Sequence, residues 1–162
     1  MNKPLSGIKI LDLTHMLSGP YGTMLLADMG ADMIKVEPLQ GEGTRKLLAT
    51  DENNSLDGFG AYFITLNRNK RSLAIDLKKK SGKALFYELV KQVDVVVSNF
   101  GPGVPERLGI DYATLKQHNE QIITCTVTGF GSEGPGAKRP AFDQVAQAYG
   151  GGMSITGTDP SH

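Results

Sequence analysis

The chain has 162 residues, of which 40% are hydrophobic, with 17 basic side chains, 17 acidic side chains and one cysteine. A formal net charge of zero argues against the broad basic surface of a nucleic-acid-binding protein, and a single cysteine excludes both an internal disulfide framework and a metal cluster held by several cysteines. The charged fraction of 21% is typical of a globular chain rather than a disordered one.

The amino-terminal sequence lacks the apolar core of a signal peptide. The longest apolar runs, such as residues 24–27 and 95–97, fall far short of the roughly 18 residues of a membrane-spanning helix. We therefore expect a soluble, cytoplasmic protein that binds neither membrane nor nucleic acid.

Short apolar runs alternate along the chain with segments of helical periodicity, which predicts a parallel sheet with helices on its faces. The expected strands are residues 8–13, 32–37, 73–77, 93–97 and 122–127. Between the first two strands, a helix is expected to begin with Ser18 as its cap and Pro20 in its first turn, and to end at Gly30. The apolar face of this helix is predicted to contain Tyr21, Met24, Leu25 and Met29.

A long irregular stretch, residues 38–60, follows the second strand. Later helices are expected from the apolar stripe within residues 85–90, around residues 105–117, and from the stripe within residues 142–149. The order βαβ, loop, βαβαβα predicts a doubly wound α/β fold with a mostly parallel sheet. After residues 150–152 there is no closing helix or strand, so we expect one domain over residues 1–162 that is cut from a longer protein.

Ligands of an open parallel sheet bind beyond the carboxyl ends of its strands. The loops expected at that edge are residues 14–19, the segment after Glu37, residues 99–103 and residues 128–140, and each contains Gly, Asn or Ser. Neither G-x-G-x-x-G nor G-x-x-x-x-G-K-[ST] occurs in the chain, which argues against classical NAD or ATP binding.

Other residues carry weaker signals. The basic segment Arg68, Lys70 and Arg71, just before the third strand, suits a ligand with several phosphates. Cys125 falls within an apolar strand and is expected to be a buried, inert thiol. The histidines show no spacing typical of a metal site or a catalytic triad, so no metal is expected. Asp143 opens the last helix, where it either complements the helix dipole or serves as a pocket carboxylate.

Several stretches together carry a resemblance to a known family, although each motif alone is weak. They are residues 4–14, 18–21, 25–32, 34–37, 66–72, 99–103, 129–131, 134–135 and 141–147. In combination they resemble the class III coenzyme A (CoA) transferases, the CaiB/BaiF family, over residues 5–157. The resemblance implies a Rossmann-like large domain that binds CoA or acyl-CoA as a substrate, a second domain supplied by later sequence, and an interlocked homodimer.

The resemblance also implies which positions contact CoA. Leu17 and Ser18 are expected near the pantetheine and its thiol, and Pro38 stands where many members of the family have an arginine that contacts phosphate. The positions expected along the adenine, the phosphates and the thioester are Ile75, Asp76, Leu77, Lys78, Asn99, Phe100, Gly101, Arg107, Arg139, Pro140, Ala141 and Phe142.

The mechanism that the resemblance implies is nucleophilic. An aspartate carboxylate attacks an acyl-CoA thioester, and CoA then passes through an aspartyl-CoA thioester to an acceptor carboxylic acid. That aspartate is expected beyond residue 162, and Asp143 matches a supporting position instead. The racemase branch of the family has a histidine where this chain has Phe142, which favours a transferase over an acyl-CoA racemase or epimerase. A non-catalytic CoA-binding module is the third possibility, and the 162-residue chain alone is expected to be inactive.

Overall fold

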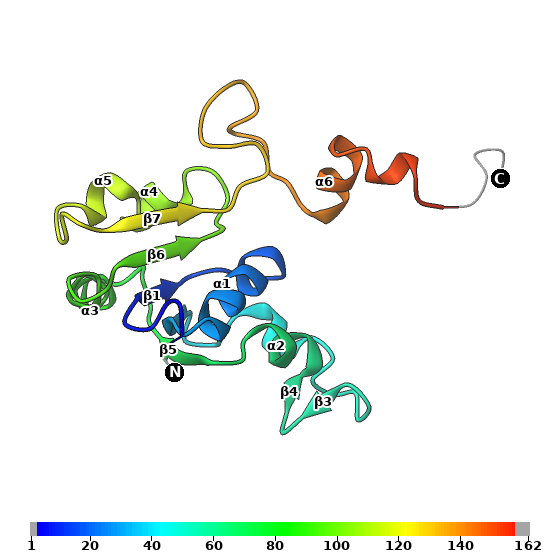
Figure 1. Ribbon diagram of the computed structural model, residues 1–162, viewed down its shortest axis with the longest axis horizontal. Coiled ribbons are helices and arrows are strands. Elements are labelled where there is room, and N and C mark those ends of the chain that lie inside the picture. Colours follow the sequence, from blue (N-terminus) through cyan, green and yellow to red (C-terminus); the bar gives the residue numbers. More distant parts are fainter. Residues whose placement is uncertain (1–2, 158–162) are drawn as a thin grey trace. The chain divides into compact units, whose positions relative to one another are not determined.

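The computed structural model describes residues 3–157, and the chain divides into two compact units, one ending at Val127 and the other beginning at Thr128. The first unit is built on a five-stranded sheet with the order β5-β2-β1-β6-β7, in which all neighbouring strands are parallel. Its strands are β1 (Lys9–Asp12), β2 (Asp32–Glu37), β5 (Lys70–Ala74), β6 (Val95–Ser98) and β7 (Ile123–Thr126). This arrangement confirms the predicted doubly wound α/β fold (Figure 1).

Helices and short elements connect these strands. In the first unit they are α1 (Ser18–Asp28), the 3-10 helix η1 (Gly43–Lys46), the hairpin β3 (Ser55–Leu56) and β4 (Phe59–Gly60), α2 (Ala61–Leu66), α3 (Lys80–Val90), α4 (Val104–Leu108) and α5 (Tyr112–Leu115). The second unit contains α6 (Asp143–Tyr149) and the 3-10 helix η2 (Gly152–Ser154). None of the helices within residues 3–157 is both long and apolar enough to cross a membrane.

The chain order of the strands reverses direction between β1 and β6. From β1 the chain proceeds outward to β2 and β5, and it then returns to the other side of β1 to form β6 and β7. The reversal leaves a crevice at the carboxyl ends of β1 and β6, which is the usual ligand site of an open α/β sheet. The loops that follow these two strands begin at Leu13 and Asn99.

Two apolar layers cover the two faces of the sheet. On one face, Leu11 and Val36 pack in the same buried cluster as Phe86 and Val90 of α3. On the other face, strand residues such as Ile10 form a second cluster with the small side chains of α1 and of the turn after it. Because successive strand residues point to opposite faces, β1, β2 and β6 each contribute to both layers.

The predicted apolar face of α1 was right for Met24 and wrong for its other three members. The helix buries Gly19, Pro20, Thr23, Met24 and Ala27, whereas the side chains expected inside with Met24 are exposed, namely Tyr21, Leu25 and Met29 (50%, 41% and 40% exposed). On this face the Thr23 hydroxyl donates to the buried Asp12 carboxylate at 2.8 Å, and the Pro20 carbonyl oxygen accepts from Lys70. The predicted Ser18 cap is also absent, since no side chain caps this helix and Ser18 is already its first residue.

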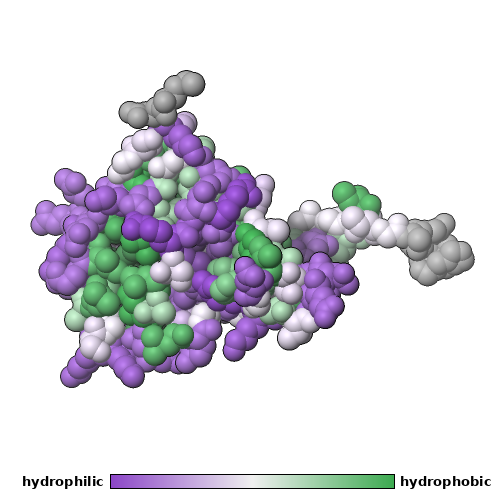
Figure 2. Space-filling model, turned by 90° about the horizontal axis from the view of Figure 1, so that it is seen from below, coloured by the Kyte–Doolittle hydropathy of each residue, from purple (hydrophilic) through white to green (hydrophobic). Residues whose placement is uncertain are grey.

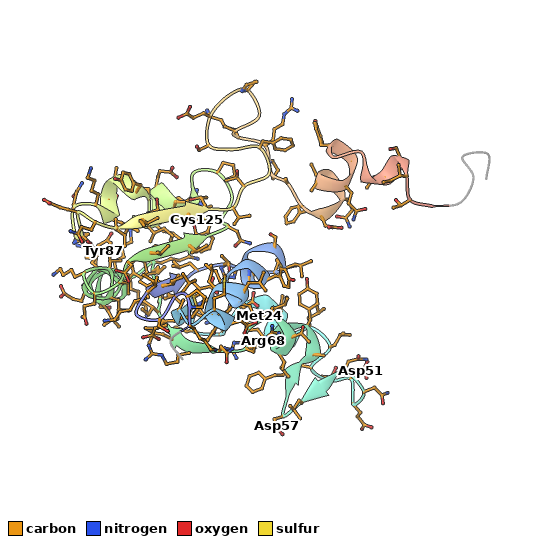
Figure 3. All side chains as sticks on the ribbon, in the orientation of Figure 1. Met24, Asp51, Asp57, Arg68, Tyr87 and Cys125 are labelled. Carbon is orange, nitrogen blue, oxygen red and sulfur yellow. The ribbon has the colours of Figure 1, made fainter. Side chains whose placement is uncertain are left out.

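Two further expectations on the strands need correction. The third strand begins at Lys70 rather than at residue 73, because Lys70 pairs with Met33 on β2. Cys125 is exposed rather than buried (Figure 3). It lies on the edge strand β7, and its neighbours on the same face, Ile123 and Val127, are 60% and 37% exposed. Figure 2 shows that hydrophobic residues also reach the surface elsewhere, in patches among hydrophilic ones.

Candidate functional site

A pocket of about 360 Å³ opens at the carboxyl edge of the sheet in the first unit. Its walls come from the ends of β1 and β2, from the segments that follow β5 and β6, and from α4. The lining residues are Leu13, His15, Val36, Glu37, Pro38, Leu39, Gln40, Ile75, Asp76, Leu77, Lys78, Phe100 and Leu108. Most of these side chains are apolar and few are charged. Such a lining is typical of a site for a small molecule that has both apolar and polar parts.

The loop between β1 and α1 is held in place by buried charged side chains. The backbone N–H and the hydroxyl of Thr14 both donate to the Asp12 carboxylate, at 2.9 Å for the N–H. The Lys35 ammonium donates to the Thr14 carbonyl oxygen at 2.8 Å. All three side chains are at most 2% exposed. This loop therefore leaves the sheet in a conformation set by groups beneath it.

The same loop is tied to the segment after β6 across the point where the strand order reverses. The Asn99 side chain accepts from the His15 backbone N–H at 2.8 Å and donates to the His15 carbonyl oxygen at 2.7 Å. The His15 ring also packs against the Phe100 ring, with 5.2 Å between the ring centroids. Asn99 thus fixes the backbone of a pocket residue through two hydrogen bonds.

Glu42 places a buried carboxylate behind the pocket wall. Its Oε2 atom lies 3.6 Å from Nδ1 of His15 and 3.4 Å from the backbone nitrogen of Met16, and its Oε1 atom accepts from the Thr44 hydroxyl. Burial opposes ionisation of this carboxyl, but its contacts with His15 and Thr44 and the positive charge of Lys35 outweigh burial and lower its pKa. Glu42 is therefore a buried anion facing an imidazole.

Glu37, at the end of β2, is fully engaged within the protein. Arg45 binds it with two hydrogen bonds, of 2.7 Å from Nε to Oε2 and 2.6 Å from Nη2 to Oε1. The Ser72 hydroxyl and the Glu42 backbone N–H also donate to it, at 2.7 and 3.0 Å. Burial opposes ionisation, but these donors outweigh burial and lower the pKa of Glu37 to about 2. Glu37 acts as an anchor for the segment of residues 38–44 that borders the pocket.

The basic segment expected to bind phosphates is instead neutralised by acids of the protein. Lys70 lies 2.9 Å from the Asp12 carboxylate, and its side chain is 1% exposed. Burial is the main reason why the pKa of Lys70 is lowered. Arg68, which Figure 3 labels, pairs with Asp28 of α1, and Arg71 pairs with Asp32 of β2. These ion pairs argue against the expected phosphate site, because the folded sheet brings a carboxylate to each cation.

Residues 5–162 match the sequence model of CoA-transferase family III. The chain belongs to this family. It is 44% identical to a formyl-CoA:oxalate CoA-transferase of Streptomyces coelicolor, over 96% of this chain and 37% of that protein. It is 43% identical to a succinyl-CoA:mesaconate CoA-transferase of Haloarcula hispanica, over 94% of this chain and 40% of that protein. The chain therefore spans about two fifths of the length of these curated relatives.

A solved structure of a CaiB/BaiF family protein from Brucella suis is similar over 99% of this chain and 42% of that one, with 40% identity and a TM-score of 0.89. The similarity agrees with the family assignment from sequence and with the α/β fold. Within residues 3–157 there is no group of three or more His, Cys, Asp or Glu side chains placed to hold a metal ion.

The structure brings some of the CoA positions implied by the family resemblance together. Five of them line the pocket: Ile75, Asp76, Leu77, Lys78 and Phe100. Asn99 is adjacent and bonds to His15, while Leu17 lies at the end of the loop before α1, and Ser18 begins that helix. Gly101 and Arg107 lie further along, before and within α4, outside the pocket lining.

The remaining expected positions belong to the second unit. Arg139 donates to the Tyr149 hydroxyl at 3.1 Å, and Phe142, which directly precedes α6, is 71% exposed. Pro140 and Ala141 lie in the segment before α6. Asp143 is in the first turn of α6, and its carboxylate accepts from Gln147.

Sequence inspection missed three ionisable residues in or next to the site, namely His15, Glu42 and Arg45. Glu42 and Arg45 lie in the stretch expected to be irregular, where periodicity carries no information about partners. The spacing of the histidines bears only on a metal site or a catalytic triad, and it carries no information about a pocket role for His15. Its position in a loop at the carboxyl edge was the signal that marked it as a pocket residue.

Proposed function

We propose that this chain is the CoA-binding part of an enzyme that transfers coenzyme A from an acyl-CoA thioester to a carboxylic acid. The main support for CoA binding is the pocket at the carboxyl edge, because residues 75–78 and Phe100 line it together. These are positions that the family resemblance assigns to CoA. The names of the relatives support the reaction class, since each describes CoA passing between an acyl-CoA and a carboxylate.

The first half of the proposed reaction forms an enzyme-bound thioester. An aspartate carboxylate, expected beyond residue 162, attacks the thioester carbonyl, so that the carbon–sulfur bond breaks and a mixed anhydride and the CoA thiolate form. The thiolate then attacks the aspartyl carbonyl of the anhydride. The donor acid leaves as a carboxylate, and aspartyl-CoA remains.

The acceptor carboxylate runs the same steps in reverse and leaves as the new acyl-CoA, which restores the aspartate. In this scheme the role of the present residues is to bind the CoA handle and to direct its thiol. Positioning of this kind lowers the barrier because it replaces an encounter in solution with a held geometry.

Several finer features of the proposal come from the family resemblance. They include a single CoA-binding domain over residues 1–162, an interlocked homodimer and a supporting role for Asp143. They also include CoA contacts from Leu17, Ser18, Gly101, Arg107 and residues 139–142. The cytoplasmic location stays a prediction. Phe142 at the position of the racemase histidine supports a transferase over a racemase.

The test is a transfer assay on the full-length protein with an acyl-CoA and a free carboxylic acid. We expect a new acyl-CoA to form, and hydroxylamine trapping followed by mass spectrometry to locate the activated group on an aspartate beyond residue 162. As a test of the pocket, calorimetry is expected to show that Phe100→Ala binds CoA more weakly than wild type. A full-length protein that binds neither CoA nor its esters would overturn the proposal, and binding without transfer would favour a non-catalytic module.

A further inference from the structure

His15 is a pocket residue whose ring is oriented by the protein. Its backbone is fixed by both polar atoms of the Asn99 side chain, and its ring contacts both the Glu42 carboxylate and the Phe100 ring. The side chain is 29% exposed and lines the pocket. Because Nδ1 is the nitrogen near Glu42, Nε2 is left to interact with a ligand. Within the described residues, no hydrogen bond joins Nε2 to another group.

Two buried charged side chains lie near His15. Glu42 is a buried anion next to the ring, and the positive charge of buried Lys35 helps to lower the pKa of Glu42. Glu37 also lines the pocket, but Arg45 neutralises it.

The segment after β5 supplies the remaining charged side chains of the pocket lining, Asp76 and Lys78. The basic side chains of the lining are therefore Lys78 and His15. Lys78 is exposed, whereas the position of His15 is fixed by its neighbours. Histidine is the side-chain type whose charge changes within the physiological pH range.

We propose that protonated His15 binds a phosphate group of CoA through Nε2, so that CoA binding is coupled to the uptake of a proton, with Glu42 as the residue that positions the ring. This inference rests on the proposed function, because it assumes that CoA occupies the pocket. A phosphate next to the ring favours the imidazolium, and by linkage a lower pH then strengthens binding. The donor is an N–H of a cation and the acceptor an anionic oxygen, which is a strong type of hydrogen bond.

The test is calorimetric titration of the full-length protein with free CoA in buffers that differ in ionisation enthalpy. The dependence of the measured heat on the buffer gives the number of protons taken up. We expect net uptake near neutral pH and a decrease in affinity on the order of tenfold between about pH 6 and about pH 8. His15→Gln is expected to abolish the uptake and to flatten the pH dependence.

Two further variants separate a proton-binding role from a structural one. Glu42→Gln removes the anion next to the ring, so the decrease in affinity should move to lower pH. His118→Gln is the matched control, because this histidine stacks on Tyr87, with 4.0 Å between the ring centroids, and does not line the pocket. It should leave both proton uptake and affinity unchanged.

A parallel titration with dephospho-CoA identifies the phosphate. Uptake that disappears with this ligand assigns the contact to the 3′-phosphate, and uptake that persists assigns it to the pyrophosphate. Protons that the CoA phosphates themselves take up or release are measured with His15→Gln and subtracted from the wild-type value. If CoA binds with the same proton uptake in wild type and His15→Gln, the inference is wrong but the proposed function stands. If CoA does not bind at any pH, the proposed function itself fails.

Discussion

Lys70 and Asp12 form a buried ion pair that spans three strands, since Lys70 starts β5, Asp12 ends β1, and β2 runs between them. The Lys70 ammonium also donates to the Pro20 carbonyl oxygen and the Thr23 hydroxyl of α1, both at 2.8 Å. Asp12 in turn accepts from Thr14 in the loop before α1. One ion pair therefore joins the sheet, the helix and the loop that leads to the pocket.

Removal of the Lys70 charge is expected to destabilise the protein strongly. Lys70→Met leaves the Asp12 carboxylate buried and unpaired, and breaking a buried pair in this way costs about 3–5 kcal/mol of unfolding free energy. Urea denaturation of the intact protein measures this loss. The double variant Lys70→Met with Asp12→Asn should recover part of it because no uncompensated charge remains. The exposed cation Arg68 provides the matched control, and Arg68→Gln should have a much smaller effect. A small loss for Lys70→Met alone would contradict this prediction.

The Glu37–Arg45 pair predicts an acid-dependent loss of stability. The pKa of Glu37 falls from the ordinary value of 4.5 to about 2 on folding, so the native state binds fewer protons than the unfolded state in this range. The resulting stabilisation, about 3 kcal/mol, is fully present above pH 4.5 and is lost as the pH falls towards 2. Urea denaturation across this pH range measures it.

Arg45→Met should reduce that dependence on pH, because Glu37 then loses the donor that most favours its ionised form. The variant should also be less stable than wild type at pH 7. An unchanged slope of unfolding free energy against pH in Arg45→Met would show that another group causes the acid sensitivity.

Asn99 is expected to affect ligand binding more than stability. In Asn99→Asp, the carboxylate can still accept from the His15 N–H, but it has no N–H to donate to the His15 carbonyl oxygen and repels it. We expect CoA affinity, measured by calorimetry, to fall about tenfold, which corresponds to the loss of one net hydrogen bond. Asn119→Asp is the control, because Asn119 donates to the carbonyls of Val90 and Val93 away from the pocket and should affect stability alone.

Gly82 in α3 permits a close approach to the segment that lines the pocket. A Cβ atom at this position would lie 2.1 Å from the Asp76 carbonyl oxygen, so Gly82→Ala must displace either the helix or the pocket wall. We expect both the melting temperature and the CoA affinity to decrease. Gly22→Ala in α1 is the control, since a Cβ atom there meets nothing within 4 Å and alanine is the better helix former. Equal behaviour of the two variants would rule out the proposed steric role.

Local patterns were sufficient for the five parallel strands, for most of the helices between them and for the position of the ligand edge, but they missed η1, the β3–β4 hairpin and α2. The second strand was predicted with the bounds observed for β2, and the alternation of strands and helices predicted the parallel sheet. Residues 75–78 and Phe100 were placed near CoA by the family resemblance and share one pocket. These results depend on hydrophobic period, turn residues and motifs, which are all properties of short segments.

The partners of the charged residues could not be predicted in this way. Lys70 pairs with Asp12 at a separation of 58 residues, and Thr23 on the buried face of α1 hydrogen-bonds to both members of that pair. Cys125 is exposed because β7 is the edge strand. Periodicity specifies which face of an element is apolar, but it does not specify which strands become neighbours. Ion pairs between distant residues and the exposure of side chains on an edge strand both depend on the strand order. They are therefore decided only by the tertiary structure.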